Sequence, residues 1–221
     1  IQLDDKAVPL KQGDELAGLD RYMLEQVCRW LRGYLDRGGR ELVVSVNVSR
    51  LGLFQEDFVE HYIQIKETYR IPDGLLDLEF TESVVLDDNA LFIRSVRRLQ
   101  QHGFLCSLDD FGTGYSSLNL LKSLPIDVLK LDILFFTRDA DHCRERIVIA
   151  NILHMARQLH IRTIAEGVEA LEQVAFLRDV GCDMVQGFVF SKPVSTAEFE
   201  KLIFARPMPL DEFDRLLEIS A

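Results

Sequence analysis

The sequence predicts an α/β fold in which parallel strands alternate with helices, most consistent with a TIM-like (β/α)8 barrel. Three observations support this class. Short β-branched or apolar runs alternate with helical apolar spacings along most of the chain, a pattern typical of βαβ units. No Gly-x-Gly-x-x-Gly follows any of these runs, which disfavours a dinucleotide-binding sheet. Polar residues close several of the runs, as they do at the active-site face of such barrels.

The first half of the chain supplies three strands and three helices. Apolar residues at helical spacing predict the helices, and a carboxylate or amide at Asp87, Asp88 or Asn89 is expected to cap the third helix. Runs rich in Val, Leu and Phe predict the strands. In chain order these elements are helix Asp14–Leu35, strand Val43–Val48, helix Phe58–Tyr69, strand Leu75–Phe80, helix Leu91–Gln101 and strand Phe104–Asp109.

The second half continues the alternation after a Gly-Ser loop and a short helix. A further helix is expected beyond Pro207 and Pro209, outside the barrel, because proline ends the preceding pattern. The elements are strand Asp127–Leu131, helix Ile147–Leu159, strand Arg162–Ala165, helix Leu171–Val180, strand Met184–Phe190, helix Thr196–Ile203 and the terminal helix Leu210–Ile219.

Six strong strands leave two of the eight barrel strands unaccounted for. Ile1–Leu10 can hold one weak strand. The other is lacking from the sequence as given. Because a barrel open by one or two strands would expose unpaired edges, we expect that strand to belong to the protein. We predict that residues 1–221 form a single domain, with about residues 204–221 as a C-terminal extension.

Composition limits the function. The chain has 221 residues, 48% hydrophobic content and a formal net charge of -11, so it has one sizeable core and no basic face for a nucleic-acid polymer. Four cysteines stand far apart without a C-x-x-C pair, which indicates reduced thiols in a cytoplasmic protein. No apolar stretch approaches the roughly 20 residues that span a bilayer, and no signal peptide opens the chain.

Polar residues stand near the carboxyl ends of the predicted strands. In a parallel barrel these ends meet at one face, where carboxylates would repel one another unless cations lie between them. Oxygen ligands without histidine favour Mg²⁺ or Mn²⁺ over zinc, and a pair of such ions suits phosphoryl displacement. These residues are Asn47, Glu79, Asp109, Asp110, Lys130, Glu166 and Gln186.

Each of these residues also has an ordinary structural interpretation. Asn47 alone is more often a turn or cap residue, and Lys130 alone could be a surface lysine whose stem lies along apolar neighbours. Glu82, Asp87 and Asp88 are more often helix-start residues than ligands. The coincidence of six polar strand ends makes the purely structural interpretation the weaker one.

Six motifs resemble those of the EAL-domain family of cyclic di-GMP phosphodiesterases. The resemblance covers roughly residues 15–203 in order and spacing, and its most specific string is DDFGTGYSSL. The motifs are SVNVS (45–49), LEFTES (78–83), LDDFGTGYSSL (108–118), LPIDVLKLD (124–132), AEGVE (165–169) and GCDMVQGFVFSKP (181–193).

The resemblance implies a role for each matching residue. Asn47, Glu79 and Asp109 correspond to ligands of one Mg²⁺ or Mn²⁺ ion, and Asp109 with Asp110 to ligands of a second. It also implies a TIM-like barrel, a bacterial cytoplasmic location and hydrolysis of cyclic di-GMP to linear pGpG. The remaining roles are Lys130 positioning the water, Glu166 contacting the second metal or acting as general base, Glu169 and Gln186 supporting the site or contacting substrate, and Glu82 steadying the loop after Asp110.

The resemblance extends to partners. The loop after Asp110 couples metal binding to dimerisation in the family, so a homodimer through this loop is expected. Sensor or cyclase domains are expected beside such a domain in a full-length protein, and no membrane segment or nucleic-acid partner is expected of this chain.

One departure divides the functional hypotheses. The family is named for a Glu-Ala-Leu motif on an early strand, with a metal-binding glutamate, and no such motif is present before Asn47; the Glu-Ala-Leu string at residues 169–171 overlaps the later AEGVE motif. Either that segment belongs to the protein and is lacking from the chain as given, or the domain is an inactive relative that binds cyclic di-GMP or a protein partner. We favour the first explanation, because every other site position is present. An unrelated metal-dependent barrel hydrolase is the remote third alternative.

Overall fold

The computed structural model describes residues 14–112, 121–132 and 142–205. By its internal contacts the chain divides into two compact units. The larger unit comprises residues 9–131 and 159–162, and the smaller unit comprises residues 1–8, 132–158 and 163–221. The single domain predicted from the sequence stays a prediction, and each unit is described by itself.

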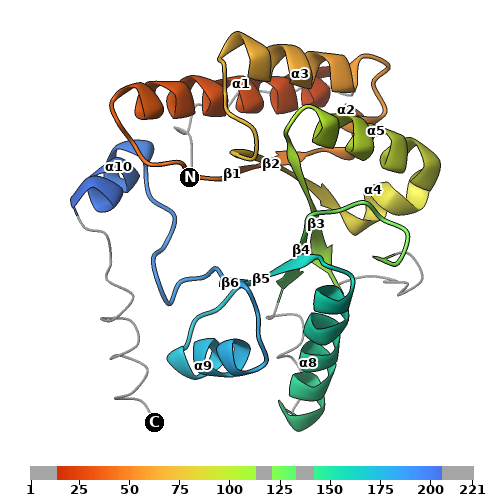
Figure 1. Cartoon of the computed structure of the whole chain (residues 1–221), viewed down its shortest axis with the longest axis vertical. Helices are drawn as coiled ribbons and strands as arrows, with labels where there is room; N and C mark the ends of the chain where they lie inside the picture. Colours follow the sequence, from red (N-terminus) through yellow and green to blue (C-terminus); the bar gives the residue numbers. More distant parts are fainter. Residues whose placement is uncertain (1–13, 113–120, 133–141, 206–221) are drawn as a thin grey trace. The chain divides into compact units, whose positions relative to one another are not determined.

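The larger unit contains four parallel strands in sequential order, β1 to β4. Helices α1 and α3 pack against one another beside the first strands (Figure 1). The elements are α1 (Asp14–Asp36), β1 (Val44–Val48), α2 (Arg50–Leu53), α3 (Phe58–Thr68), β2 (Leu76–Thr81), α4 (Glu82–Asp87), α5 (Asn89–Gln101), β3 (Leu105–Phe111) and β4 (Val128–Asp132), of which Asp132 falls in the smaller unit.

The core of the larger unit includes the buried side chains of strand β2 and the apolar stripe of helix α5. Leu76, Leu78 and Phe80 are fully buried in β2, and the ring of Phe80 meets that of Phe92 edge-on at 5.2 Å between centroids. Burying a Leu or Phe side chain contributes about 1.5–3 kcal/mol. A central strand that is buried on both faces carries a near-continuous apolar run, which is why LLDLEF was recognisable in the sequence.

Helix α5 begins at Asn89, two residues before the predicted start at Leu91. The side chain of Asp88 accepts a hydrogen bond from the backbone N–H of Leu91 at 2.8 Å, so Asp88 is the capping residue among the three candidates. The sequence predicts Asp87 as a helix-start residue, and this prediction is wrong. Asp87 is the last residue of α4 and pairs with Arg50, with 2.6 Å between Nε and Oδ2.

The smaller unit contains the remaining elements, and its strands β5 and β6 pair in parallel. Ile164 lies opposite Met184, and Ala165 lies opposite Val185. The elements are α8 (His142–Gln158), β5 (Arg162–Glu166), of which Arg162 belongs to the larger unit, α9 (Leu171–Asp179), β6 (Met184–Val185) and α10 (Thr196–Ala205).

Strand β6 is much shorter than the predicted Met184–Phe190. After Val185 the chain turns, and the backbone N–H of Phe190 donates to the carbonyl of Gly187 at 3.1 Å. Gly187 lies so close to the backbone of Val168 that an added Cβ would overlap it. The alternating apolar residues of this segment suggested a strand, but the close approach at Gly187 produces a turn.

Four other predictions differ from the structure or fall outside it. Helix α8 begins at His142, five positions before the predicted start at Ile147. The weak strand expected in residues 1–10, the short helix after the Gly-Ser loop and the terminal helix at 210–219 fall wholly or partly outside the described residues. None of the helices in the described part of the chain combines the length and the apolar character needed to cross a bilayer.

Candidate functional site

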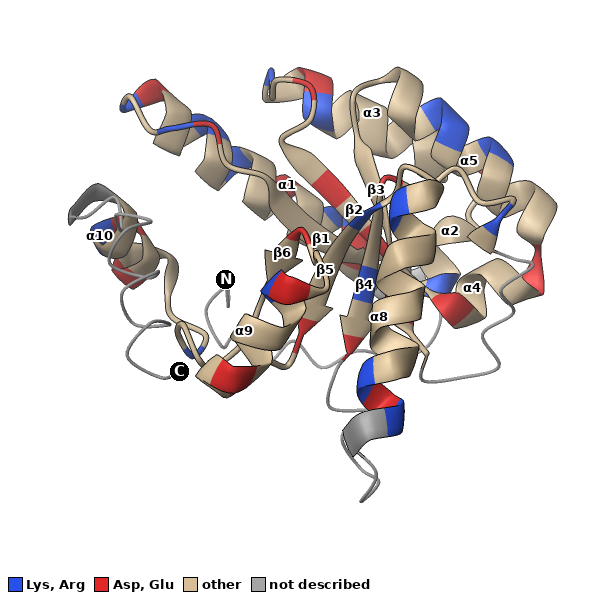
Figure 2. Cartoon of the chain, turned by 60° about the horizontal axis from the view of Figure 1, so that its bottom comes forward, with Lys and Arg blue, Asp and Glu red and all other residues tan. Residues whose placement is uncertain are grey.

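Strand pairing in the larger unit places four of the predicted site residues on neighbouring strands. Asn47 of β1 lies directly opposite Glu79 of β2. Asp109 of β3 lies opposite Thr81 of β2. Thr81 is two residues beyond Glu79, so the side chains of Glu79, Thr81 and Asp109 are on the same face of the sheet. Lys130 stands on the next strand, one residue after the pairing of Leu129 with Leu108. Figure 2 shows that β4 carries both a basic and an acidic position.

Lys130 forms a buried ion pair at this site. Its Nζ donates to Oε1 of Glu79 at 2.6 Å and lies 3.9 Å from Oδ1 of Asp109. The side chains of Lys130 and Glu79 are 5% and 7% exposed, and that of Asp109 is 14% exposed. A lysine removed from water in this way is stable only beside an anion. The interpretation of Lys130 as a surface lysine is therefore wrong.

Asp110 has an unusual backbone. Its φ is 57°, in the left-handed region that Asp and Asn tolerate better than most residues. Its N–H donates to Oδ1 of Asp109 at 2.9 Å, and the pairing of β3 with β4 shifts register between Leu108 and Phe111. Such an irregularity interrupts the strict alternation of side chains along β3, which would otherwise send two consecutive aspartates to opposite faces.

The donor chemistry fits a hard divalent cation. Asn47, Glu79 and Asp109 offer one amide and two carboxylate groups from three adjacent strands, and oxygen donors of this kind suit Mg²⁺ or Mn²⁺. Within the ranges that the structure describes, no three His, Cys, Asp or Glu side chains gather as a metal site by themselves. The candidate site therefore depends on the amide of Asn47 as well as on carboxylates, and it includes Lys130 as a cation.

Three other predicted site residues belong to the smaller unit. Glu166 ends strand β5 and precedes Gly167, whose φ is 71°. Glu169 is exposed, and its backbone N–H donates to the side chain of Gln173 at 2.9 Å. Gln186 lines a cavity of about 540 Å³ together with Phe188 and Phe190. That Glu166, Glu169 and Gln186 join the residues of the larger unit in one site stays a prediction.

Glu82 is the first residue of helix α4 and is 6% exposed. Its position as a helix-start residue agrees with the structural interpretation given to it from the sequence. Its predicted role concerns the loop after Asp110, most of which lies in residues 113–120, outside the described residues.

Sequence reasoning missed a buried carboxylate beneath the site. Asp77 lies two residues before Glu79 on β2 and is 2% exposed. It accepts hydrogen bonds from Ser107 Oγ at 2.6 Å and from Ser45 Oγ at 3.1 Å. Burial raises the pKa of Asp77, the hydrogen bond from Ser107 opposes that rise, and the charge of Glu79 adds to it. The available signal was the alternation of two acidic residues within the apolar strand LLDLEF.

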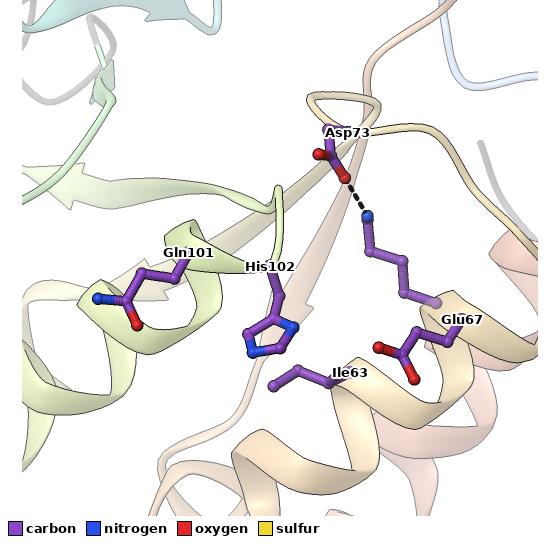
Figure 3. A pocket seen from close by; sticks show the side chains of 6 residues that line it. Ile63, Glu67, Asp73, Gln101 and His102 are labelled. Atoms are coloured by element: carbon purple, nitrogen blue, oxygen red, sulfur yellow. Dashed lines mark hydrogen bonds and ion pairs between the residues drawn. The ribbon is translucent and has the colours of Figure 1, made fainter.

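A cavity in the larger unit lies at the opposite ends of the strands. It measures about 320 Å³ and is lined by residues at the end of α3, before β2 and at the end of α5. Lys66 and Asp73 pair across it with 2.6 Å between Nζ and Oδ1 (Figure 3). Conserved function in parallel barrels is found at the carboxyl ends of strands, so this cavity is separate from the candidate site. Its lining is Ile63, Lys66, Glu67, Asp73, Gln101 and His102.

Comparisons with known proteins agree with the fold. A protein named Cyclic di-GMP phosphodiesterase NbdA, from Pseudomonas aeruginosa, is 37% identical over 183 residues, which are 83% of this chain and 23% of NbdA. The crystal structure of the EAL domain of Mycobacterium smegmatis DcpA matches with a TM-score of 0.81 and 34% identity, over 87% of both chains. A manganese and cyclic di-GMP complex of Klebsiella pneumoniae BlrP1 matches with a TM-score of 0.72 and 27% identity, over 83% of this chain and 46% of BlrP1.

These matches confirm the predicted α/β fold class of TIM-like barrels, with six parallel strands in the described residues. The chain spans between 20% and 30% of the length of the curated relatives it matches. The model of the family described as EAL domain matches residues 9–193. On this match and on the identity to NbdA, the chain belongs to the EAL domain family.

Proposed function

We propose that the chain is a metal-dependent phosphodiesterase domain that hydrolyses cyclic di-GMP to linear pGpG. The observation that carries this proposal is the gathering of Asn47, Glu79, Asp109 and Lys130 on four neighbouring strands, with Lys130 buried against Glu79. The names of relatives such as NbdA support the substrate. The site is an arrangement of oxygen donors and one ammonium, which suits the polarisation and displacement of a phosphodiester.

Each residue has a part in the proposed reaction. Asn47, Glu79, Asp109 and Asp110 would hold the one or two Mg²⁺ or Mn²⁺ ions, which would supply a Lewis acid and an acidified water. The ammonium of Lys130 orients the attacking water by donating a hydrogen bond to it. Glu166 accepts the proton that this water loses. The new bond joins the water oxygen to phosphorus, the bond from phosphorus to the ribose 3′ oxygen breaks, and that oxygen takes up a proton.

The substrate and partner assignments belong to the same proposal. Gln186 and Glu169 contact or support the bound nucleotide, and the cavity of about 540 Å³ beside Gln186 has the size of a ligand pocket. Residues 1–221 act as one domain, with Glu82 steadying the loop after Asp110. Two such domains pair through that loop, and sensor or cyclase domains accompany the chain in a bacterial, cytoplasmic protein.

The test combines a nucleotide assay with matched acidic variants. Asp109→Ala and Glu79→Ala should each abolish Mg²⁺- or Mn²⁺-dependent conversion of cyclic di-GMP to pGpG, measured by anion-exchange chromatography. Asp73→Ala is the control, because the side chain of Asp73 is 81% exposed and lies at the opposite ends of the strands. Retained conversion in Asp109→Ala would refute the proposed metal site.

The alternative function is an inactive cyclic di-GMP receptor or interaction module. The same experiment separates the two functions. Wild-type protein that binds cyclic di-GMP and leaves it intact with either metal would establish the receptor and refute the enzyme.

A further inference from the structure

The carboxylate of Asp77 joins three neighbouring strands from inside the larger unit. Both of its oxygens lie 2.6 Å from Oγ of Ser107 on β3, and Oδ2 also accepts from Oγ of Ser45 on β1 at 3.1 Å. Asp77 is 2% exposed and Ser107 is fully buried. These side-chain bonds connect β1, β2 and β3 in addition to the backbone pairing between the strands.

This bridge repeats the geometry of the candidate metal ligands one layer below them. Each bridge residue stands two positions before a proposed ligand on the same strand, so side chains of both layers point to the same face. Ser45 precedes Asn47, Asp77 precedes Glu79, and Ser107 precedes Asp109. Any change in the separation of the strands at the bridge is therefore transmitted to the layer in which the proposed ligands stand.

We infer that Asp77 is a positioning residue, which sets the separation of Asn47, Glu79 and Asp109 through its hydrogen bonds to Ser45 and Ser107. This inference rests on the proposed metal-dependent function. Asp77 is not among the proposed metal ligands or substrate contacts. It acts through the strands on which the ligands stand, as groups that orient metal ligands do in other proteins.

The chemistry of the bridge favours this role over simple packing. A carboxylate buried between strands is costly unless it is satisfied by hydrogen bonds, and an apolar residue of similar size would fill the same space at lower cost. Hydroxyl groups on both neighbouring strands supply the required hydrogen bonds here. A short residue with two acceptor oxygens can join both strands at once, which no apolar residue can do.

Asp127 provides a matched control in the same unit. Its Oδ2 accepts from the backbone N–H of Cys106 and from the side chain of Gln100, both at 2.9 Å. It therefore joins elements by hydrogen bonds, as Asp77 does. It precedes strand β4, so it lies at the opposite ends of the strands from the candidate site.

The experiment measures the dissociation constant of Mn²⁺ by calorimetry for the wild-type chain, Asp77→Ala, Asp77→Asn and Asp127→Ala, with thermal unfolding to confirm that each is folded. Loss of a group that orients metal ligands costs about 10- to 100-fold in metal affinity, and we expect this loss for Asp77→Ala. Asp77→Asn keeps one acceptor oxygen and should recover part of the affinity. Asp127→Ala should lower the unfolding temperature and leave the affinity within about two-fold.

Ser107→Ala gives a second route should Asp77→Ala not fold, because it removes the 2.6 Å bond and keeps the carboxylate. Its loss of affinity is expected at the lower end of the same range. Equal Mn²⁺ affinity in the wild type and in every folded variant of Asp77 and Ser107 would overturn the inference. A wild type that binds Mn²⁺ but leaves cyclic di-GMP intact would refute only the proposed activity, and one that binds no Mn²⁺ would refute both.

Discussion

Two lysines of the larger unit form ion pairs of the same length in different surroundings. Lys130 pairs with Glu79 and Lys66 pairs with Asp73, each with 2.6 Å between Nζ and the carboxylate oxygen. Both lysine side chains are buried, at 5% and 8% exposure. The carboxylates differ, because the side chain of Glu79 is 7% exposed and that of Asp73 is 81% exposed. Replacement of each lysine by methionine keeps most of the apolar stem and removes the charge.

The difference in carboxylate burial sets the expected loss of stability. Lys130→Met leaves Glu79 in a buried place without its ammonium partner, and breaking a buried pair costs about 3–5 kcal/mol in the free energy of unfolding. Lys66→Met leaves a carboxylate that water already solvates, and pairs with an exposed partner contribute about 0–1 kcal/mol. The two variants should therefore differ by at least about 2 kcal/mol.

Urea unfolding in the presence of EDTA, followed by circular dichroism, measures both losses without metal. Lys130→Met should unfold at a clearly lower urea concentration than Lys66→Met. Equal losses for the two variants would refute the reasoning, because carboxylate burial would then have no effect on the strength of these pairs. Added Mn²⁺ should stabilise Lys130→Met, since a cation bound at Glu79 takes over the charge compensation that lysine provided.

Three other predictions concern catalysis, pH and packing. Lys130→Ala should lower turnover of cyclic di-GMP far more than it lowers Mn²⁺ affinity, because in the proposed reaction the amine acts on water and is not a ligand. Equal losses in kinetics and calorimetry would show that its role is misassigned. Burial raises the pKa of Asp20 above its ordinary 3.8, although hydrogen bonds from Ser49 oppose the rise. The stability linked to this proton is complete below about pH 3.8 and is lost as the pH rises through the raised pKa. Asp20→Asn should therefore gain stability relative to the wild type as the pH rises from about 4 to about 7 in urea unfolding. A difference in unfolding free energy that stays constant over this range would contradict the prediction. Gly187→Ala should lower the stability of the chain by about 1–3 kcal/mol, because its Cβ would overlap the backbone of Val168, and an unchanged unfolding temperature would contradict that.

The sequence was sufficient to predict the strands of the larger unit and the face at which polar residues gather. Alternating valines in VVSVNV identified β1, whose residues alternate between buried and exposed, and the near-continuous apolar run LLDLEF identified the buried strand β2, each within one residue at each end. The run LLDLEF also made Glu79 conspicuous, because a charged side chain interrupts a buried apolar strand only where something compensates it, whereas Asn47 is at an exposed position of β1. The pattern failed at Met184–Phe190, where the approach of Gly187 to Val168 turns the chain after two strand residues.

By itself, then, the sequence determined the order of the elements, the EAL family motifs and the strands on which the acidic residues stand. Only the tertiary structure decided which side chains are neighbours. Lys130 meets Glu79 across 51 positions of sequence, and Asp77 meets Ser107 across 30. Alternation along a strand fixes the face of each side chain, but partner and register come from pairing between strands that are distant in the chain. For that reason the buried ion pair and the Asp77 bridge became visible only in the folded structure.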